Sequence, residues 1–242
     1  MESLDASCDF DLPNRLNRDG FAIVRRVITK EQIETLRQLC QSLADIPSVS
    51  RRKNSIYGLR NLLSCSAEMR QLVNASPYHE LAASVVGPSA RAVYGVFFDK
   101  TPEANWPVPW HQDVTIHVRE DRNVSGFEAR SQKDGAVHML PPVEVSEQML
   151  AIRINLDEAS SSHGALRVIP ESHRLGRLSN DAMAKLIETR PAINCDVQAG
   201  DLMLMRPLLV HASSACEKPD HRRVIHIEYA PFDLPGGLEW HG

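Results

Sequence analysis

The chain has 242 residues, of which 43% are hydrophobic and 24% are charged, and its formal net charge is −4. This length allows one large core, and the acidic balance gives no reason to expect nucleic acid or an anionic membrane as a partner. No apolar run approaches the length that spans a bilayer, and no basic segment followed by an apolar one opens the sequence. The five cysteines are scattered and form no C-x-x-C pair. We therefore expect a cytoplasmic protein with reduced thiols.

The first 90 residues are expected to be largely helical. A short β-rich run, "FAIVRRVI", covers residues 21–28 and leads into an amphipathic helix within 29–46. This helix opens on a threonine with a glutamine three residues later, the pattern of a capping box. Residues 62–87 predict two further helices, separated near Ser76–Pro77.

After residue 90 the pattern favours strands. "ARAVYGVFFDK" at 90–100 is typical of a buried strand, and one further helix is expected at 180–189. A long polar segment, residues 114–148, is expected to be a loop. Four more strands are expected in the second half, at 149–157, 164–170, 200–211 and 222–230. The sequence thus predicts one domain, residues 1–242, in which a β-barrel or sandwich over 91–242, with the 114–148 loop inserted, packs against the largely helical residues 1–90.

The segment "PWHQD", residues 109–113, offers a candidate metal motif. On a strand, residues two apart point to the same side, so His111 and Asp113 can direct an imidazole nitrogen and a carboxylate oxygen at one point. These are two of the three ligands of the 2-His-1-carboxylate triad of non-haem iron oxygenases. A histidine and an aspartate at this spacing also occur together by chance, so the motif needs support elsewhere.

A third ligand has to come from another strand, and His211 ends the expected strand 200–211. Taken alone, this histidine could equally be a strand-capping residue. The strand that follows has two distinct faces by alternation. Arg223 belongs to the apolar face, which should pack against helices. The other face is mixed and suits a pocket, in which an arginine can bind a carboxylate through two parallel hydrogen bonds: Arg222, Val224, His226 and Glu228.

His226 and Glu228 also have the spacing of metal ligands. Only His241 follows them, next to the last residue of the sequence given, so a distal third histidine is missing. We interpret this pair as pocket lining.

Candidate substrate-binding residues are less well defined. Arg153 and Asn155 alternate with apolar residues in "LAIRINLD" and are expected to face the barrel interior. There Arg153 could bind an acidic substrate or co-substrate, or could pair with Glu228. Further candidates lie near the metal motif or on the mixed face, and the 114–148 segment is a candidate lid: Trp106, Trp110, His117 and His226.

Four motifs, in order, resemble the phytanoyl-CoA dioxygenase-like branch of the Fe(II)/2-oxoglutarate oxygenases. They are "DGFAIVRRVITKEQIETLR", "PWHQD", "SSHGALRVIPESHRLG", and "AGDLMLMRPLLVHASS" followed by "HRRVIHIEYA". The resemblance covers most of the chain and implies a double-stranded β-helix, the jelly-roll barrel of cupin-like proteins. One departure is Glu171, which stands where the family more often has glycine and indicates a backbone without positive φ.

The resemblance also implies a chemistry. His111, Asp113 and His211 are the expected Fe(II) ligands, Arg222 is the expected partner of the 2-oxoglutarate carboxylate, and Ser213 is expected to add a hydrogen bond. With O₂, such an enzyme converts 2-oxoglutarate to succinate and CO₂ while oxidising a small organic substrate. The carboxylate at 113 favours hydroxylation over halogenation. Two alternatives remain on the same barrel: a metal-dependent hydrolase, and a non-catalytic protein that binds a metal or a small molecule.

Overall fold

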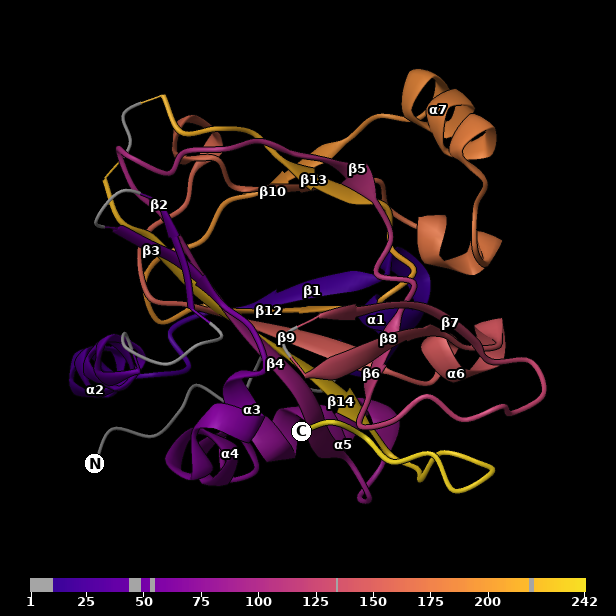
Figure 1. The fold of residues 1–242 in the computed structure, drawn as a ribbon. Helices are drawn as coiled ribbons and strands as arrows, with labels where there is room; N and C mark the ends of the chain where they lie inside the picture. The colour runs from indigo at the N-terminus through magenta and orange to yellow at the C-terminus, as the bar shows by residue number, and fades with distance from the viewer. Residues whose placement is uncertain (1–10, 44–48, 53–54, 134, 218–219) are drawn as a thin grey trace.

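The computed structural model describes residues 11–43, 49–52, 55–133, 135–217 and 220–242. Its strands pair antiparallel and form two facing sheets with a third, smaller sheet beside them (Figure 1). The large sheet has seven strands, in the order β1 (Phe21–Val24), β12 (Leu202–Met205), β9 (Leu150–Asn155), β14 (Arg222–Ala230), β4 (Arg91–Lys100), β3 (Ser55–Leu59) and β2 (Val49–Arg52).

The second sheet has four strands and faces the large one, which gives the expected double-stranded β-helix. Its order is β11 (Ile193–Cys195), β10 (Leu166–Val168), β13 (His211–Ser213) and β5 (Val108–His111). The third sheet has three strands, β6 (Ile116–Val118), β8 (Ala136–Leu140) and β7 (Glu128–Lys133).

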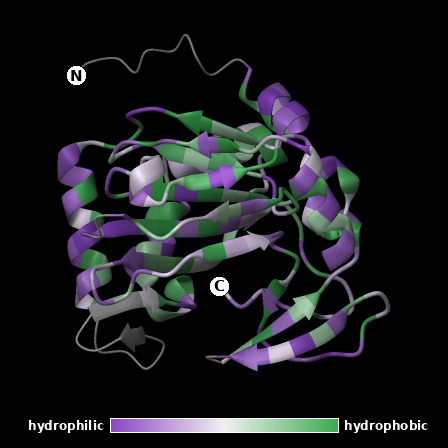
Figure 2. Cartoon of the chain, turned by 90° about the horizontal axis from the view of Figure 1, so that it is seen from above, coloured by the Kyte–Doolittle hydropathy of each residue, from purple (hydrophilic) through white to green (hydrophobic). Residues whose placement is uncertain are grey.

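Helices cover the outside of the sheets. Those of the N-terminal region lie against the large sheet, whereas α7 lies beside the four-stranded sheet (Figure 1). The helices are α1 (Leu12–Asp19), α2 (Lys30–Ser42), α3 (Leu62–Cys65), α4 (Ala67–Val73), α5 (Tyr78–Val86), α6 (Val143–Glu147) and α7 (Asn180–Thr189), with 3₁₀ turns η1 (Ser161–His163) and η2 (Ser172–Leu175). Along the peripheral helices hydrophilic and hydrophobic residues alternate, as amphipathic helices with one packed face require (Figure 2).

The capping box expected at the start of α2 is present. The Thr29 hydroxyl accepts from the Gln32 backbone N–H at 3.3 Å, and the Gln32 side chain accepts from the Thr29 N–H at 2.8 Å. The helix then buries one side against the core through Ile33, Leu36, Leu39 and Cys40. Sequence signals therefore located this helix because its start and its packed face both depend on local spacing.

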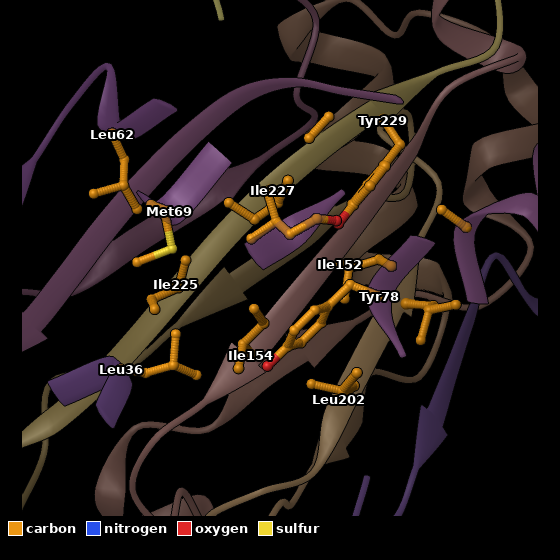
Figure 3. Packing of buried hydrophobic residues seen from close by; sticks show 14 of the residues in the cluster. Leu36, Leu62, Met69, Tyr78, Ile152, Ile154, Leu202, Ile225, Ile227 and Tyr229 are labelled. Atoms are coloured by element: carbon orange, nitrogen blue, oxygen red, sulfur yellow. The ribbon is translucent and has the colours of Figure 1, made fainter. Parts of the chain in front are cut away.

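Alternation along β14 separates the core from the interior of the barrel, as predicted. Ile225, Ile227 and Tyr229 are fully buried and pack against residues of the helices, including Leu36, Leu62, Met69 and Tyr78 (Figure 3). Burying each such side chain contributes about 1.5–3 kcal/mol to stability. The opposite face of the strand carries Arg222, His226 and Glu228 into a cavity.

Strand β1 lies within the β-rich run expected at 21–28, but β2 and β3 were not expected, and both join the large sheet. Residues 62–87 form three helices, α3 to α5, although the break near Ser76–Pro77 is where the sequence predicts it. Helix α1 was not anticipated. It buries only Leu12 and Leu16, and one apolar pair gives too weak a periodicity to detect.

The prediction of a single strand at 200–211 is wrong, because this segment contains β12 and the start of β13 as two separate strands. Pro207 lies in the turn between them and lacks the N–H that a continuous strand would need. The turn transfers the chain from the large sheet, where β12 pairs with β1 and β9, to the small sheet, where β13 pairs with β10 and β5.

The prediction that residues 114–148 form a loop is also wrong. It forms the three-stranded sheet and α6, and its buried residues, among them Val118, Val137 and Met139, build a second small core with Trp240. Strand β7 is largely exposed and therefore lacks the alternation of hydrophobic residues that identifies a strand in a sequence.

Three smaller expectations have mixed outcomes. Glu171 adopts φ of +65°, so the inference that this backbone does not need positive φ is wrong. The cysteines of the described segments form no disulfide, as expected for reduced thiols, whereas Cys8 lies outside the described residues. Among the helices of the described segments, none combines the length and apolar character needed to cross a membrane.

Candidate functional site

A cavity of about 360 Å³ lies inside the barrel. Its wall on the large sheet comes from β4, β9 and β14, and the facing wall comes from β5 and β13. The three-stranded sheet contributes His117 from β6 and His138 from β8. The segment that was expected to be a lid therefore supplies some of the cavity wall.

His111, Asp113 and His211 meet at this cavity. The register of β5 and β13 places His111 opposite His211, with ring centroids 4.1 Å apart. One oxygen of Asp113 lies 3.6 Å from Nε2 of His111, and the other lies 3.7 Å from Nε2 of His211. One ligand atom from each residue lies within 4.8 Å of the other two, a spacing that can hold a metal ion.

Hydrogen bonds on the far sides of both imidazoles set which nitrogen is free. Nδ1 of His111 bonds to the Pro109 carbonyl at 2.8 Å, and Nδ1 of His211 bonds to the Leu209 carbonyl at 2.9 Å. A carbonyl only accepts, so each Nδ1 carries the proton and donates it. Each Nε2 then presents a lone pair towards Asp113, as metal-binding histidines do.

The charges at the triad fit a divalent cation. Burial lowers the pKa of His211 to about 4, so its imidazole is neutral at neutral pH. Burial alone would raise the pKa of Asp113, but nearby His211, His226, His111 and Arg153 outweigh it and hold that pKa below the ordinary value. The Oδ2 atom of Asp113 is buried and has no hydrogen-bond partner among the described residues. A neutral His211 imidazole, an ionised carboxylate and an unsatisfied oxygen together suit a bound metal.

Gln112 lies between His111, the last residue of β5, and Asp113, which follows that strand, and its hydrogen bonds fix the motif. Its amide donates to the carbonyls of Gly176 and Leu208 and accepts from the Leu178 N–H. The backbone N–H of Asp113 donates to the Pro207 carbonyl at 2.9 Å. These contacts hold the segment against the 207–208 turn and so set the direction of both ligands.

A second region of the cavity is strongly cationic. Arg222 pairs in register with Lys100 of β4, and both side chains are buried. Nζ of Lys100 donates to Oγ of Ser213 at 3.1 Å and to the Ser214 carbonyl at 2.6 Å. Burial, followed by the charge of Arg222, lowers the pKa of Lys100 to about 7. Two buried cations beside a hydroxyl form a site for a carboxylate.

Sequence analysis missed Lys100. Alternation along β4 could have placed it on the cavity face, since it occupies the same side as Tyr94, Val96 and Phe98. Because the expected strand is mostly apolar, we interpreted it as a buried core strand and did not consider Lys100, at its end, as a site residue.

Gly164 supports the guanidinium of Arg222. Its carbonyl accepts a hydrogen bond from Nη1 of Arg222, while Nε of Arg222 has no hydrogen-bond partner in the described part of the chain. Gly164 has φ of +67°, and a Cβ here would lie 2.5 Å from the Ser214 carbonyl oxygen. A glycine is therefore required both for the backbone conformation and for the close packing beside Arg222.

The structure separates the remaining substrate candidates. Trp106, His117, Arg153 and His226 line the cavity. Arg153 donates to Nδ1 of His226 at 3.2 Å, and the ion pairs among the described residues do not include one between Arg153 and Glu228.

Trp110 and Asn155 do not line this cavity. Trp110 alternates with His111 and packs on the outside, with Ile169 and Leu186 under α7. Asn155 donates to the Asp201 carbonyl at 3.1 Å and so ties β9 to the turn before β12. Trp110 was assigned to the site because it is next to His111 in sequence, and Asn155 because it alternates with apolar residues. Neither criterion predicts which residues the side chain contacts in the folded protein.

The match to a protein-family model decides the family. The model described as phytanoyl-CoA dioxygenase matches residues 16–224, which is most of the chain. The chain belongs to the phytanoyl-CoA dioxygenase family. This confirms the resemblance seen in the ordered motifs.

Similar proteins include the iron/alpha-ketoglutarate-dependent dioxygenase ausU of Aspergillus calidoustus, 24% identical over 88% of this chain and 68% of that protein. A phytanoyl-CoA dioxygenase domain-containing protein 1 homolog of Caenorhabditis elegans is 22% identical and is covered over 90% of both chains. Among solved structures, AviO1 of Streptomyces viridochromogenes is 26% identical with a TM-score of 0.66 over 98% of each chain. EctD of S. alaskensis with bound Fe has the same fold, with a TM-score of 0.71 at 17% identity over 95% of this chain and 79% of that chain.

Proposed function

We propose that this phytanoyl-CoA dioxygenase family member is an Fe(II)- and 2-oxoglutarate-dependent oxygenase that hydroxylates a small organic molecule in the cytoplasm. The observation that carries the proposal is one cavity with a 2-His-1-carboxylate cluster and a buried pair of cations. The name of the fungal relative, an iron/alpha-ketoglutarate-dependent dioxygenase, supports the same chemistry.

His111, Asp113 and His211 would hold the iron. Bound iron supplies the activation of O₂ that couples conversion of 2-oxoglutarate to succinate and CO₂ with oxidation of a substrate C–H bond. The backbone carbonyls of Pro109 and Leu209 keep both imidazoles in the tautomer that leaves Nε2 free. Because this arrangement is fixed before any ion binds, little reorganisation is needed on loading.

Arg222, Lys100 and Ser213 would bind the carboxylate of 2-oxoglutarate that lies away from the metal. The guanidinium offers a planar fork, the ammonium adds a second charge, and the hydroxyl is already aligned by Lys100. A hydrolase that used the same metal ligands would not need this cationic end of the cavity.

The proposal is tested by thermal stability of anaerobic protein with Mn(II), with and without 2-oxoglutarate. A ligand at a hundred times its dissociation constant adds about 2.7 kcal/mol to the folded state. For this chain length the melting temperature should rise by about 5–10 °C. Aerobic protein with Fe(II) and ascorbate should also form succinate from 2-oxoglutarate. No shift with metal bound, together with no succinate, would contradict the proposal.

Lys100 predicts how 2-oxoglutarate binding depends on pH. The pKa of the free enzyme's Lys100 is about 7, below its ordinary value, and a bound dianion would raise it again. Binding therefore takes up a proton once the pH exceeds about 7. We expect the affinity to be greatest below pH 7 and to fall by up to about tenfold per pH unit above it. Titration calorimetry from pH 6 to 9 measures this slope. The Lys100→Met variant should bind more weakly and lose the slope, whereas an unchanged slope in that variant would assign the titration to another group.

A further inference from the structure

One region of the cavity is not used by the proposed metal and co-substrate sites. It is a polar cluster, called here the histidine–glutamate cluster, formed from β4, β6, β8 and β14. Its members are Tyr94, His117, His138, His226 and Glu228. Asp113 acts electrostatically on His117, His226 and Glu228, which places the cluster beside the metal triad.

Two buried polar atoms of the cluster lack hydrogen-bond partners. They are Nδ1 of His117 and Oε2 of Glu228, for which the described residues supply no partner; the two atoms lie 3.7 Å apart, too far for a good hydrogen bond between them. Both residues are less than a tenth exposed. Buried polar side chains in folded proteins are nearly always hydrogen-bonded, so each exception needs an explanation. Two such atoms at the wall of one cavity indicate that a ligand completes their hydrogen bonds.

Arg153 determines which nitrogen of His226 carries the proton. Its guanidinium can only donate, so Nδ1 of His226, at 3.2 Å from it, is the acceptor. A neutral His226 therefore carries its proton on Nε2, which lies 4.0 Å from Oε1 of Glu228. The cluster thus offers a donor at His226 beside the unpaired atoms of Glu228 and His117.

Two neighbouring aromatic rings fix the position of the His117 imidazole in the cluster. The ring of Tyr94 stacks on His117 with centroids 3.4 Å apart and an angle of 7° between planes. His138 meets the same imidazole edge-on, with centroids 4.4 Å apart. The position of His117 is therefore set by ring packing, while its Nδ1 stays available to a ligand.

We propose that the histidine–glutamate cluster is a substrate subsite that binds adjacent hydroxyl groups, as in a sugar or another polyol. This inference rests on the proposed oxygenase function, since it names the class of molecule presented to the metal. A hydroxyl both donates and accepts, so it can bridge Glu228 and His117 in either tautomer of the imidazole. A second hydroxyl on the next carbon can accept from Nε2 of His226.

A charged ligand fits this subsite less well. Arg153 contacts His226, and Arg60 also lines the cavity, so a cation would add to charge of the same sign. Burial, with the nearby charge of Asp113, raises the pKa of Glu228 well above its ordinary value. Burial lowers the pKa values of His117 and His226 to about 3. Burial therefore disfavours the charged forms of all three groups, so they are poor partners for a charged ligand.

Saturation-transfer difference NMR on the Zn(II)- and 2-oxoglutarate-loaded, anaerobic protein tests the subsite without turnover. The probes are methyl α-D-glucopyranoside and myo-inositol. 2-Methoxytetrahydropyran serves as the ring without hydroxyls, and n-butylamine and butyrate serve as charged probes. We expect saturation transfer to the two hydroxylated probes and much less to the other three.

Variants assign the signal to the cluster. Glu228→Leu and His117→Phe should each weaken binding of the hydroxylated probes about tenfold, because a hydrogen bond is lost in a buried site. Glu228→Gln keeps polar atoms at this position and should retain most of the binding. Glu239→Leu removes an exposed carboxylate from the same end of the chain and should change nothing.

The 2-oxoglutarate-dependent rise in melting temperature, measured on every variant, separates this inference from the proposed function. If 2-oxoglutarate stabilises the proteins but the hydroxylated probes do not bind, or bind Glu228→Leu and His117→Phe as well as wild type, the subsite is wrong and the oxygenase proposal stands. Stronger transfer to n-butylamine or butyrate would also overturn the subsite. If 2-oxoglutarate does not stabilise the wild type while the polyol probes bind it, the oxygenase proposal fails and the cluster is a hydroxyl-binding site of another protein class.

Discussion

Replacing Asp113 with alanine is expected to abolish metal binding and, with it, conversion of 2-oxoglutarate to succinate. The carboxylate faces both free imidazole nitrogens at 3.6 and 3.7 Å, and its Oδ2 has no other partner. Changing a group that only supports a ligand costs about 10–100-fold in metal affinity, so loss of a direct ligand should exceed about 100-fold. Titration with Mn(II), followed by electron paramagnetic resonance or calorimetry, measures the change.

The same variant should not unfold the protein. In the metal-free state the carboxylate has an unsatisfied buried oxygen, so its removal should leave the melting temperature close to the wild-type value. Gln112→Ala provides the contrast, because it removes three hydrogen bonds that position the motif and should lower stability together with metal affinity. An Asp113→Ala variant that binds Mn(II) as tightly as wild type would exclude this triad as the metal site.

Replacing Arg222 with alanine is expected to weaken 2-oxoglutarate binding while metal binding is retained. Truncating one partner of a buried charged pair costs about 2–5 kcal/mol, and each 1.4 kcal/mol is a factor of ten in affinity. We therefore expect a dissociation constant at least about 30-fold higher, with Lys100 providing the remaining attraction. Anaerobic calorimetry with Mn(II)-loaded protein measures it.

The neighbouring residue offers a matched control. Arg223 lies on the opposite face of β14, where its guanidinium forms two hydrogen bonds to the Asp157 carboxylate at 2.8 and 2.9 Å. Arg223→Ala should lower stability but leave the affinity for 2-oxoglutarate unchanged. Equal loss of affinity in both variants would mean that Arg222 acts on the fold and does not contact the co-substrate.

Much of the candidate site follows from local spacing. The proximity of His111 and Asp113, the alternation that separates Arg222 from Arg223, and the capping box of α2 depend on residues a few positions apart, although β5 ends at His111 and Asp113 follows it. Such patterns survive in the sequence because strand and helix geometry is the same in every protein. The order of the four motifs then identified the family that the match over residues 16–224 confirms.

Other features of the site depended on pairings that no local pattern encodes. Lys100 joins Arg222 because β4 and β14 pair in that register, and the three-stranded sheet brings His117 to Tyr94 from a segment with the polar composition of a loop. Trp110 lies beside His111 in sequence but packs outside the barrel.

Four ordered motifs in the sequence identified the family, and the resemblance to that family indicated the three candidate metal ligands and the arginine. Only the tertiary structure decided which side chains surround them. It placed Lys100 at the cationic end, paired Arg153 with His226, and brought unsatisfied atoms of Glu228 and His117 to the same cavity. The physical reason is that burial and hydrogen bonding depend on contacts between strands distant in the chain. Hydrophobicity and alternation show which face of a strand is inside, but not which residue lies opposite.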